Sequence, residues 1–523
     1  MQTSLRNRST DRSYAGRVGL LTVVTVLAKL VGALYRIPLT NIIGAEGVGV
    51  YQLIFSIYAL AIAATSSFHT TLISRQVAAY RAMGEEGKAK GYFFTALAES
   101  SLSALAVSFL LFFLGEKIAS AQGITGGGIG YRVIAPAVVA VSLLACFKGW
   151  FNGNMDLAPT AASMIIEQSF KLAIGISLAA LFRERGAIYA SAAALLGVTA
   201  SEGAAVIVLA ILYWKKRTRA GAIRMSFRSV LHDGAPLRLG SIILPLAAFA
   251  DSLLVVRLLR LNGEDARRGV AIYGIFSGAV NSIVNFPVVL VLAVAIAIIP
   301  VIAKSKATRD ISELKEKSDL TVKVTLVISL PCALALAMLA PQIISFLYPV
   351  FSEGEAALAS RLLRIGAGSV LFLSLTQIYA SLLQSIDRAG VAAESQAISS
   401  LVRMILLCVT VPKIGAMGIA VSGLIAYFLT MTLDLLKWLQ YTGRMRNAMK
   451  TLASVGLSGG IMILTISAPA MLLRNALLSL VVSAAVGSAM YLFIILRLHV
   501  FSFKELKSMP LSSITTKIGR YYG

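Results

Sequence analysis

Charged residues are scarce in this sequence. Asp, Glu, Lys and Arg make up 14% of the 523 residues, whereas a soluble globular domain usually carries about 25%. Hydrophobic residues make up 57%, and the mean hydropathy is +0.81. A fold surrounded by water could not bury so much apolar surface. The composition therefore excludes an ordinary soluble protein and predicts that lipid is the main solvent of the chain.

Residues and motifs that would support catalysis are also rare. The three cysteines, Cys146, Cys332 and Cys408, lie in separate apolar stretches, and the three histidines are scattered. This spacing predicts neither a disulfide framework nor a metal centre. The sequence contains no G-x-x-x-x-G-K-[ST] motif and no long hydrophilic stretch, so ATP-driven transport within this chain is not expected. No nucleophile–base set is apparent, and we predict neither a cofactor nor an enzymatic activity.

Long apolar runs dominate what is present. A helix needs about 20 apolar residues to cross the hydrocarbon core of a membrane. The runs predict an all-α polytopic membrane protein of about fourteen transmembrane helices. The predicted spans cover residues 17–38, 48–74, 92–114, 129–148, 158–182, 187–213, 234–257, 270–302, 320–348, 360–385, 392–411, 415–440, 452–473 and 475–497.

The net charge of +24 is explained by the loops between these spans. Lys and Arg accumulate in cytoplasmic loops, where they also face anionic lipid. With the N-terminus inside, most of the 48 basic residues fall on the cytoplasmic side. The segment 257–268 lies outside on this reading, although it carries four arginines. We predict a multi-pass protein of the cytoplasmic membrane with both termini inside, an uncleaved first span, and no binding of nucleic acid.

An internal repeat links the two halves of the sequence. With a constant offset of 232 and no gap, residues 151–172 align with residues 383–404. The alignment matches Asn152 with Gln384 and Lys171 with Arg403. Both copies predict a helix end, a polar turn and a new helix that contains a cation. Parallel repeats of this kind are typical of transporters with two lobes.

The repeat and the loops together predict an organisation into six parts. These are a basic cytoplasmic N-terminus (1–16), an N-lobe of six spans (17–213), a basic cytoplasmic linker (214–233), a C-lobe of six spans (234–440), two additional spans (452–497) and a cytoplasmic tail (498–523).

Several ionisable residues fall within the predicted spans, where a charge is costly and usually faces a partner or a path. Lys29 and Arg36 are seven residues apart on one helix face, just before the helix-breaking Pro38. Two cations without a nearby acid favour a cavity that holds a diphosphate. Glu167 and Lys171, four residues apart, can pair with each other. Arg257 is placed either at such a cavity or simply at a helix end.

The acids within the spans have two interpretations. Glu99, Glu202 and Asp434 lie singly on the third, sixth and twelfth spans, and Asp251 lies on the seventh. They are candidate proton sites. The alternative, and the commoner role of such acids, is that of a buried hydrogen-bond partner. His69 on the second span is interpreted as a polar group that contacts another helix, with pH sensing as the alternative.

Four stretches carry a resemblance to a known family. The most specific are KLVGALYRIPLTNIIGAEGVGVYQLIFSIYAL (29–60) and the KGWFNG…PTAAS…EQ…K pattern (148–171), supported by ISRQVA (73–78) and ADSLLVVRLL (250–259). They resemble the polysaccharide biosynthesis / stage V sporulation protein B family. This family is related to the lipid II flippase within the multidrug/oligosaccharidyl-lipid/polysaccharide exporter superfamily.

The resemblance implies a fourteen-helix exporter with alternating access. The implied substrate is an undecaprenyl-diphosphate-linked sugar, such as the peptidoglycan precursor lipid II. In the relatives, cations on the first span and on the opposing lobe contact the head group, which implies this role for Lys29, Arg36 and Arg257, with Arg75 near a helix end. The last two spans, 452–497, are expected beside a membrane-facing groove that guides the lipid tail.

Three functions stay open at this point. The first is a flippase for a lipid-linked oligosaccharide or peptidoglycan precursor, with the cell-wall synthesis machinery as a further candidate partner. The second is a multidrug or cation antiporter of the same superfamily, which cations on the first span disfavour. The third is a scaffold for wall or spore assembly. The candidate head-group residues are Lys29, Arg36, Arg75, Lys171, Arg257 and Arg403, and the candidate coupling or structural acids are Glu99, Glu167, Glu202, Asp251 and Asp434.

Overall fold

The computed structural model describes residues 19, 21–216, 221–443, 448–473, 475–502 and 505 of the chain. The fold is 89% helical, and no strand occurs within these described ranges. This composition of secondary structure confirms the all-α prediction. In lipid, no water is available to bond the backbone. A helix forms because it satisfies the N–H and C=O groups of a segment by hydrogen bonds within that segment.

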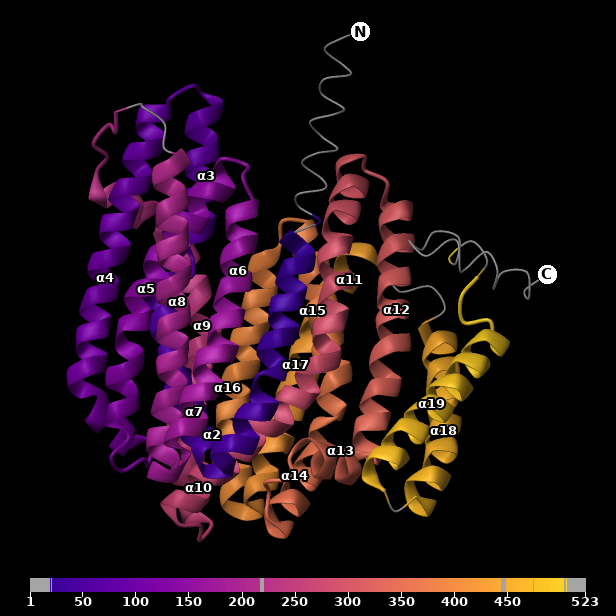
Figure 1. Cartoon of the computed structure of the whole chain (residues 1–523). Helices are drawn as coiled ribbons and strands as arrows, with labels where there is room; N and C mark the ends of the chain where they lie inside the picture. The colour runs from indigo at the N-terminus through magenta and orange to yellow at the C-terminus, as the bar shows by residue number, and fades with distance from the viewer. Residues whose placement is uncertain are drawn as a thin grey trace. The chain divides into compact units, whose positions relative to one another are not determined.

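The helices follow one another with short connections (Figure 1). A first helical stretch covers residues 21–34. It is followed by α2 (Arg36–Thr65), α3 (His69–Ala82), α4 (Glu86–Ala121), α5 (Gly128–Gly153), α6 (Ala158–Phe170), η1 (Lys171–Gly175), α7 (Ile176–Phe182), η2 (Arg183–Arg185), α8 (Ala187–Lys216), α9 (Phe227–Leu261), α10 (Ala266–Gly274), η3 (Ile275–Val280), α11 (Asn281–Ala307), α12 (Ile311–Met338), α13 (Ala340–Leu347), α14 (Glu353–Gly366), α15 (Gly368–Ser385), α16 (Ala389–Ile414), α17 (Ala416–Thr442), α18 (Ala448–Leu472) and α19 (Ala476–Arg497).

The number of apolar helices agrees with a polytopic membrane protein. Within the described residues, 12 helices are long and apolar enough to cross a membrane, or 13 when the bent pair α14 and α15 counts as one span. One of the 12 is the 62-residue stretch Leu21–Ala82. At ~1.5 Å per residue it measures about 93 Å, enough to cross a ~30 Å hydrocarbon core twice. It covers most of the first predicted span (17–38) and all of the second (48–74), so the count agrees with about fourteen.

Large apolar side chains on these helices face outward. Phe109 is 64% exposed, Leu181 is 73% exposed and Leu464 is 72% exposed. A water-soluble protein rarely leaves so many such side chains in contiguous exposed positions. Their exposure is what a lipid solvent requires, and the chain is a multi-pass membrane protein.

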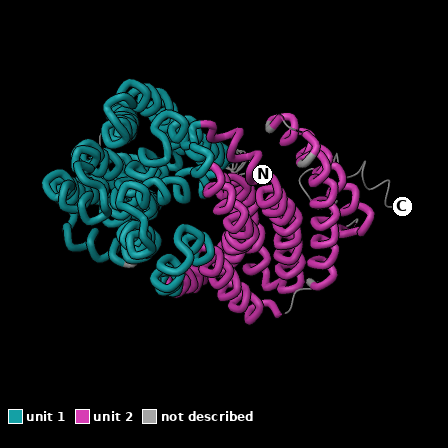
Figure 2. Tube along the Cα trace, turned by 90° about the horizontal axis from the view of Figure 1, so that it is seen from below, with its two compact units in different colours: residues 1–282, 350–355, 400–422 teal, residues 283–349, 356–399, 423–523 magenta. Residues whose placement is uncertain are grey.

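The chain divides into two compact units, coloured separately in Figure 2. Unit 1 comprises residues 1–282, 350–355 and 400–422, and unit 2 comprises residues 283–349, 356–399 and 423–523. Each unit has its own apolar core. In unit 1, Phe93 stacks near Trp150 and Tyr213, with ring centroids 5.0 and 5.2 Å away. The N-lobe (17–213) and C-lobe (234–440) predicted from the sequence stay a prediction.

The core of unit 2 lies where α12, α15 and α17 pack together. Its buried members include Val322, Ile378, Leu382 and Trp438. The last two helices, α18 and α19, form a pair that packs against α12. This pair contains the two additional spans predicted over 452–497.

The predicted repeat is confirmed at its central turn. After α5, the amide of Asp156 donates to the carbonyl of Phe151 at 3.0 Å, and after α15 the amide of Arg388 donates to the carbonyl of Leu383 at 2.9 Å. These bonds are related by the offset of 232. Met155 and Asp387, at the same offset, both have positive φ angles, 58° and 61°. A non-glycine residue seldom adopts this conformation, so the shared strain supports a true structural repeat.

Two glycines let α8 approach the π-helix η1. A Cβ added to Gly197 on α8 would lie 2.3 Å from the Cα of Gly175 in η1. The π-helix widens the helix by one residue in the turn that begins at Lys171, and segments of this type often occur at functional sites. The close contact therefore fixes the position of the turn that carries Lys171.

We predict that Gly197→Ala destabilises the protein by roughly 1–3 kcal/mol, because an added methyl group would overpack this contact. The matched control is Gly203→Ala on the same helix, where a Cβ would meet no atom within 4 Å. The control should be neutral or slightly stabilising, because Ala favours a helix over Gly by about 1 kcal/mol. Thermal unfolding of the purified protein in detergent measures both changes. Equal midpoints for the two variants would show that the close approach is not needed.

Candidate functional site

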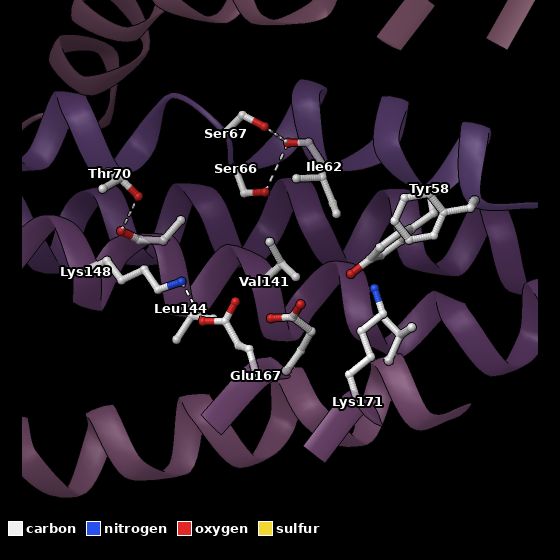
Figure 3. A pocket seen from close by; sticks show the side chains of 14 residues that line it. Tyr58, Ile62, Ser66, Ser67, Thr70, Val141, Leu144, Lys148, Glu167 and Lys171 are labelled. Atoms are coloured by element: carbon white, nitrogen blue, oxygen red, sulfur yellow. Dashed lines mark hydrogen bonds and ion pairs between the residues drawn. The ribbon is translucent and has the colours of Figure 1, made fainter. Parts of the chain in front are cut away.

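A cavity of about 290 Å³ lies within unit 1, between α2, α3, α5, α6, η1 and α8 (Figure 3). We call it the N-terminal cavity. Most of its wall is apolar or hydroxyl-bearing, but four ionisable side chains also line it: Lys148, Glu167, Lys171 and Glu202. Few cavities at membrane depth carry so many charges, because each ion must be compensated or used.

Helix α5 places Lys148 opposite α6, which carries Glu167. Lys148 Nζ lies 2.6 Å from Glu167 Oε1, and the two side chains remain 14% and 15% exposed. Figure 3 shows this contact as a dashed line at one side of the cavity. The residual exposure indicates that small polar molecules reach the pair. The opposite charges of Lys148 and Glu167 cancel, so the pair adds no net charge to this side of the cavity.

This pairing corrects the sequence prediction that Glu167 and Lys171 pair with each other. The two residues are four apart, but α6 ends at Phe170 and the π-helix begins at Lys171. The ammonium of Lys171 lies over the rings of Tyr35 and Phe55, at 5.1 and 5.5 Å from their centroids. Lys171 is therefore held by cation–π attraction. Lys148 was missed as a site residue, although the motif KGWFNG begins with it.

Two polar atoms beside this lysine are buried and unsatisfied. The Oε2 atom of Glu202 and the hydroxyl of Tyr58 have no hydrogen-bond partner among the described residues. Both side chains line the N-terminal cavity. Buried polar atoms are nearly always hydrogen-bonded, so an unsatisfied pair that lines a cavity indicates space for water or a ligand.

A second group of charges in unit 1 surrounds Tyr273 on α10. Arg403 Nη2 lies 2.9 Å from Asp251 Oδ2, and Arg36 Nη1 donates to Ser282 Oγ at 3.4 Å. The charges of Asp251, Arg403 and Arg36 all lie within electrostatic range of the Tyr273 phenol. Arg36 is also in range of Lys171. We call Arg36, Lys171 and Arg403 the basic cluster, because the structure brings these three predicted residues into one unit.

The remaining predicted cations lie on the surface of unit 1. Lys29, Arg75 and Arg257 are exposed, and none forms a hydrogen bond or an ion pair with another residue in the described part of the chain. Their role at the head group stays a prediction. The sequence expectation that Lys29 and Arg36 act from one helix face also stays untested, and the helix is interrupted at Tyr35, close to the predicted break.

Glu99 is a buried interhelical partner, as one sequence interpretation predicted. Its Oε2 lies 2.7 Å from His69 Nε2, and its Oε1 accepts from Arg238 Nη2 at 2.6 Å. His69 is fully buried and Glu99 is 3% exposed. The network ties α3, α4 and α9 together. Arg238 lies in the predicted span 234–257, but its contact with Glu99 was not foreseen, because the partner comes from another helix.

Asp434 on α17 is the one predicted acid that lies in unit 2. Its side chain is fully buried beside Ser395 of α16 and forms no ion pair with a residue that the structure describes. Neither a coupling role nor a purely structural role follows from its position, and its assignment as a coupling acid stays a prediction.

An all-helical chain with a dozen apolar spans, a structural repeat and cations held at membrane depth defines the class of multi-pass membrane transporters. The chain belongs to the polysaccharide biosynthesis protein family, whose model matches residues 16–306. The MatE family model matches residues 236–410. These matches confirm the resemblance inferred from the sequence and place the chain in the multidrug/oligosaccharidyl-lipid/polysaccharide exporter superfamily.

Individual relatives agree with this family. Stage V sporulation protein B of Bacillus subtilis (strain 168) is 23% identical over 418 residues, which cover 77% of this chain and 79% of that protein. The lipid II flippase MurJ of the same organism is 22% identical over 418 residues, covering 74% of this chain and 75% of that protein. A solved structure of a lipid II flippase MurJ in an inward closed conformation has a TM-score of 0.73 at 16% identity, covering 92% of this chain and 98% of that one.

These comparisons confirm the predicted exporter fold. The relatives whose activities are known are flippases or transporters, and the chain is a transporter of this superfamily rather than an enzyme, as the sequence predicted.

We predict that Lys148→Met lowers the unfolding midpoint by several degrees, since it leaves the partly buried Glu167 carboxylate without its cation. The double variant Lys148→Met, Glu167→Gln should recover most of the loss, because it removes both charges. Thermal unfolding in detergent provides the measurement.

The control for this pair is Lys216→Met. Lys216 pairs with Asp156 at 2.6 Å, but the two side chains are 53% and 30% exposed. Exposed pairs contribute about 0–1 kcal/mol, so this variant should change the midpoint little. A double variant at 148 and 167 as unstable as the single one would show that the ion pair is not the source of the effect.

Proposed function

We propose that the chain is a flippase for a lipid-linked anionic substrate, namely an undecaprenyl-diphosphate-linked oligosaccharide or a peptidoglycan precursor such as lipid II. The observation that carries this proposal is the basic cluster, in which Arg36, Lys171 and Arg403 lie on apolar spans within one unit, with Arg403 paired to Asp251 and Lys171 held over aromatic rings. The similarity to the lipid II flippase MurJ over three quarters of both chains supports the same substrate class.

Arginine and lysine suit a diphosphate for a physical reason. The guanidinium presents several N–H donors in a fixed plane, and charge-assisted hydrogen bonds to phosphate are about twice as strong as neutral ones. Arg36 Nη1 donates to the hydroxyl of Ser282 over a long distance of 3.4 Å. Such a contact is easily exchanged for a phosphate oxygen, whereas the 2.9 Å pair of Arg403 with Asp251 holds that cation in place.

Transport by this route needs no covalent step. The charged head group would leave water for the basic cluster while the polyprenyl tail stays in lipid. A change of conformation would then expose the head group on the other side, which is alternating access. The cations lower the cost of moving a diphosphate through the membrane, because they replace the hydration that the phosphates lose.

The membrane and the orientation belong to the same proposal. We place the chain in the cytoplasmic membrane with both termini inside, on the basis of the basic loops. The predicted N-lobe (17–213) and C-lobe (234–440) are proposed as its moving elements. We also propose the cell-wall synthesis machinery as a partner.

A multidrug or cation antiporter is the second candidate. The match of residues 236–410 to the MatE model favours it. It would need acids to dominate the binding site. In unit 1, Glu167 and Asp251 are each paired with a cation, at 2.6 and 2.9 Å. The flippase therefore fits the charges better.

We predict that Arg36→Ala reduces the rate of lipid II flipping at least tenfold, since the loss of one charge-assisted hydrogen bond costs about 1.5–3 kcal/mol. Arg36→Lys should retain part of the activity, because it keeps the charge without the planar donor set. Flipping is measured with purified protein in liposomes that contain fluorescent lipid II.

The matched control is Arg183→Ala, which removes an exposed arginine with no ion pair among the described residues. It should flip lipid II at the wild-type rate. Normal flipping by Arg36→Ala would contradict the proposed site. Resistance to cationic drugs in a sensitised host, without any flipping by the wild type, would favour the antiporter.

A further inference from the structure

The N-terminal cavity differs in chemistry from the basic cluster beside it. Lys148 is neutralised by Glu167 at 2.6 Å. Glu202 contributes a second carboxylate, and its Oε2 atom has no hydrogen-bond partner among the described residues. With Lys148 and Lys171 as its cations and Glu167 and Glu202 as its acids, the cavity of about 290 Å³ offers a diphosphate no excess of positive charge. The cavity therefore fits a different part of the substrate from the one that the basic cluster fits.

The open hydrogen-bonding groups of the cavity require a ligand that both donates and accepts. The free Oε2 atom of Glu202 accepts a hydrogen bond when the carboxyl is ionised, and the Lys171 ammonium donates only. The unsatisfied hydroxyl of Tyr58 can do either. A sugar hydroxyl is a donor and an acceptor at once, so neighbouring hydroxyls of one ring can satisfy all three groups without adding charge.

The shape and the lining of the cavity agree with a sugar. The rings of Phe55 and Tyr58 supply apolar faces for the C–H side of a pyranose. The volume lies near the lower end of the range for small-molecule pockets, about 300–1,000 Å³. It is sufficient for one sugar ring. Figure 3 shows Tyr58 and Lys171 pointing toward each other at one end of this space.

Lys171 joins the two regions. It lines the N-terminal cavity and also lies within electrostatic range of Arg36. We propose that the N-terminal cavity is a carbohydrate subsite that binds the sugar directly attached to the diphosphate, with Glu202 accepting a hydrogen bond from a sugar hydroxyl. This inference rests on the proposed flippase function and extends it, because it assigns specificity for the sugar to residues outside the basic cluster.

The test compares two probes on the full-length protein in detergent. One is undecaprenyl diphosphate, and the other is undecaprenyl diphosphate that carries a single N-acetylhexosamine. The wild type should bind the sugar-bearing lipid at least fivefold more tightly. Glu202→Ala should abolish this preference and leave the affinity for undecaprenyl diphosphate within twofold of the wild type. Tyr58→Phe, which keeps the ring, should reduce the preference about twofold to threefold.

Arg36→Ala separates the failure of the inference from the failure of the proposed function. This variant should lower the affinity for both lipids by the same factor and preserve the preference for the sugar-bearing lipid. A wild type that binds neither lipid would contradict the proposed function itself. Two results would overturn the carbohydrate subsite and leave the flippase proposal in place. One is a wild type that binds both lipids equally tightly, and the other is a Glu202→Ala variant that loses the same affinity for both lipids.

One further outcome assigns Glu202 to a different ligand. If its substitution alters the Na⁺ or pH dependence of binding equally for both lipids, Glu202 binds a cation or a proton, and the subsite is overturned. Unfolding midpoints of Glu202→Ala and Tyr58→Phe within a few degrees of the wild type verify that each variant is folded.

Discussion

The cost of placing a charge at membrane depth governs the arrangement of this protein. An ionisable side chain within a span must find a counter-charge, a hydrogen-bonding network or an aromatic face, because lipid supplies none. Each solution occurs in unit 1. Glu99 is enclosed by His69 and Arg238, and Lys171 lies over Tyr35 and Phe55. Two groups remain where a substrate can act: Arg36, whose hydrogen bond to Ser282 is long, and Glu202, whose Oε2 atom has no partner among the described residues.

The backbone reinforces this arrangement at two places. A π-helix begins at Lys171, and the contact of Gly197 with Gly175 holds it against α8. A repeated turn joins α5 to α6 and α15 to α16, with the same hydrogen bond and the same positive φ in each copy. Lys171 and Arg403 follow these turns at equivalent positions. Their surroundings differ, because Arg403 has an acid partner at 2.9 Å and Lys171 has aromatic rings instead.

Much of the fold could be predicted from the sequence, because long apolar runs and basic loops follow directly from the lipid solvent. The repeat was also predictable from its matched polar positions, such as Asn152 with Gln384. The partners of the charges were less accessible. Helical spacing suggested that Glu167 pairs with Lys171, yet a π-helix begins between them and Lys148 from α5 takes the carboxylate. Spacing within one helix says nothing about side chains that come from another helix. Lys148 and Arg238 were therefore not identified as partners, and Tyr58 was not identified as a cavity residue.

The central claim is that a diphosphate binds to the basic cluster of unit 1. The most direct measurement is an experimental structure of the protein with an undecaprenyl-diphosphate-linked sugar bound. The account predicts phosphate density within hydrogen-bonding distance of Arg36 and Lys171, with the Arg36 contact to Ser282 lost. Phosphate density elsewhere, with Arg36 still on Ser282 and Lys171 still enclosed by its aromatic rings, would contradict it.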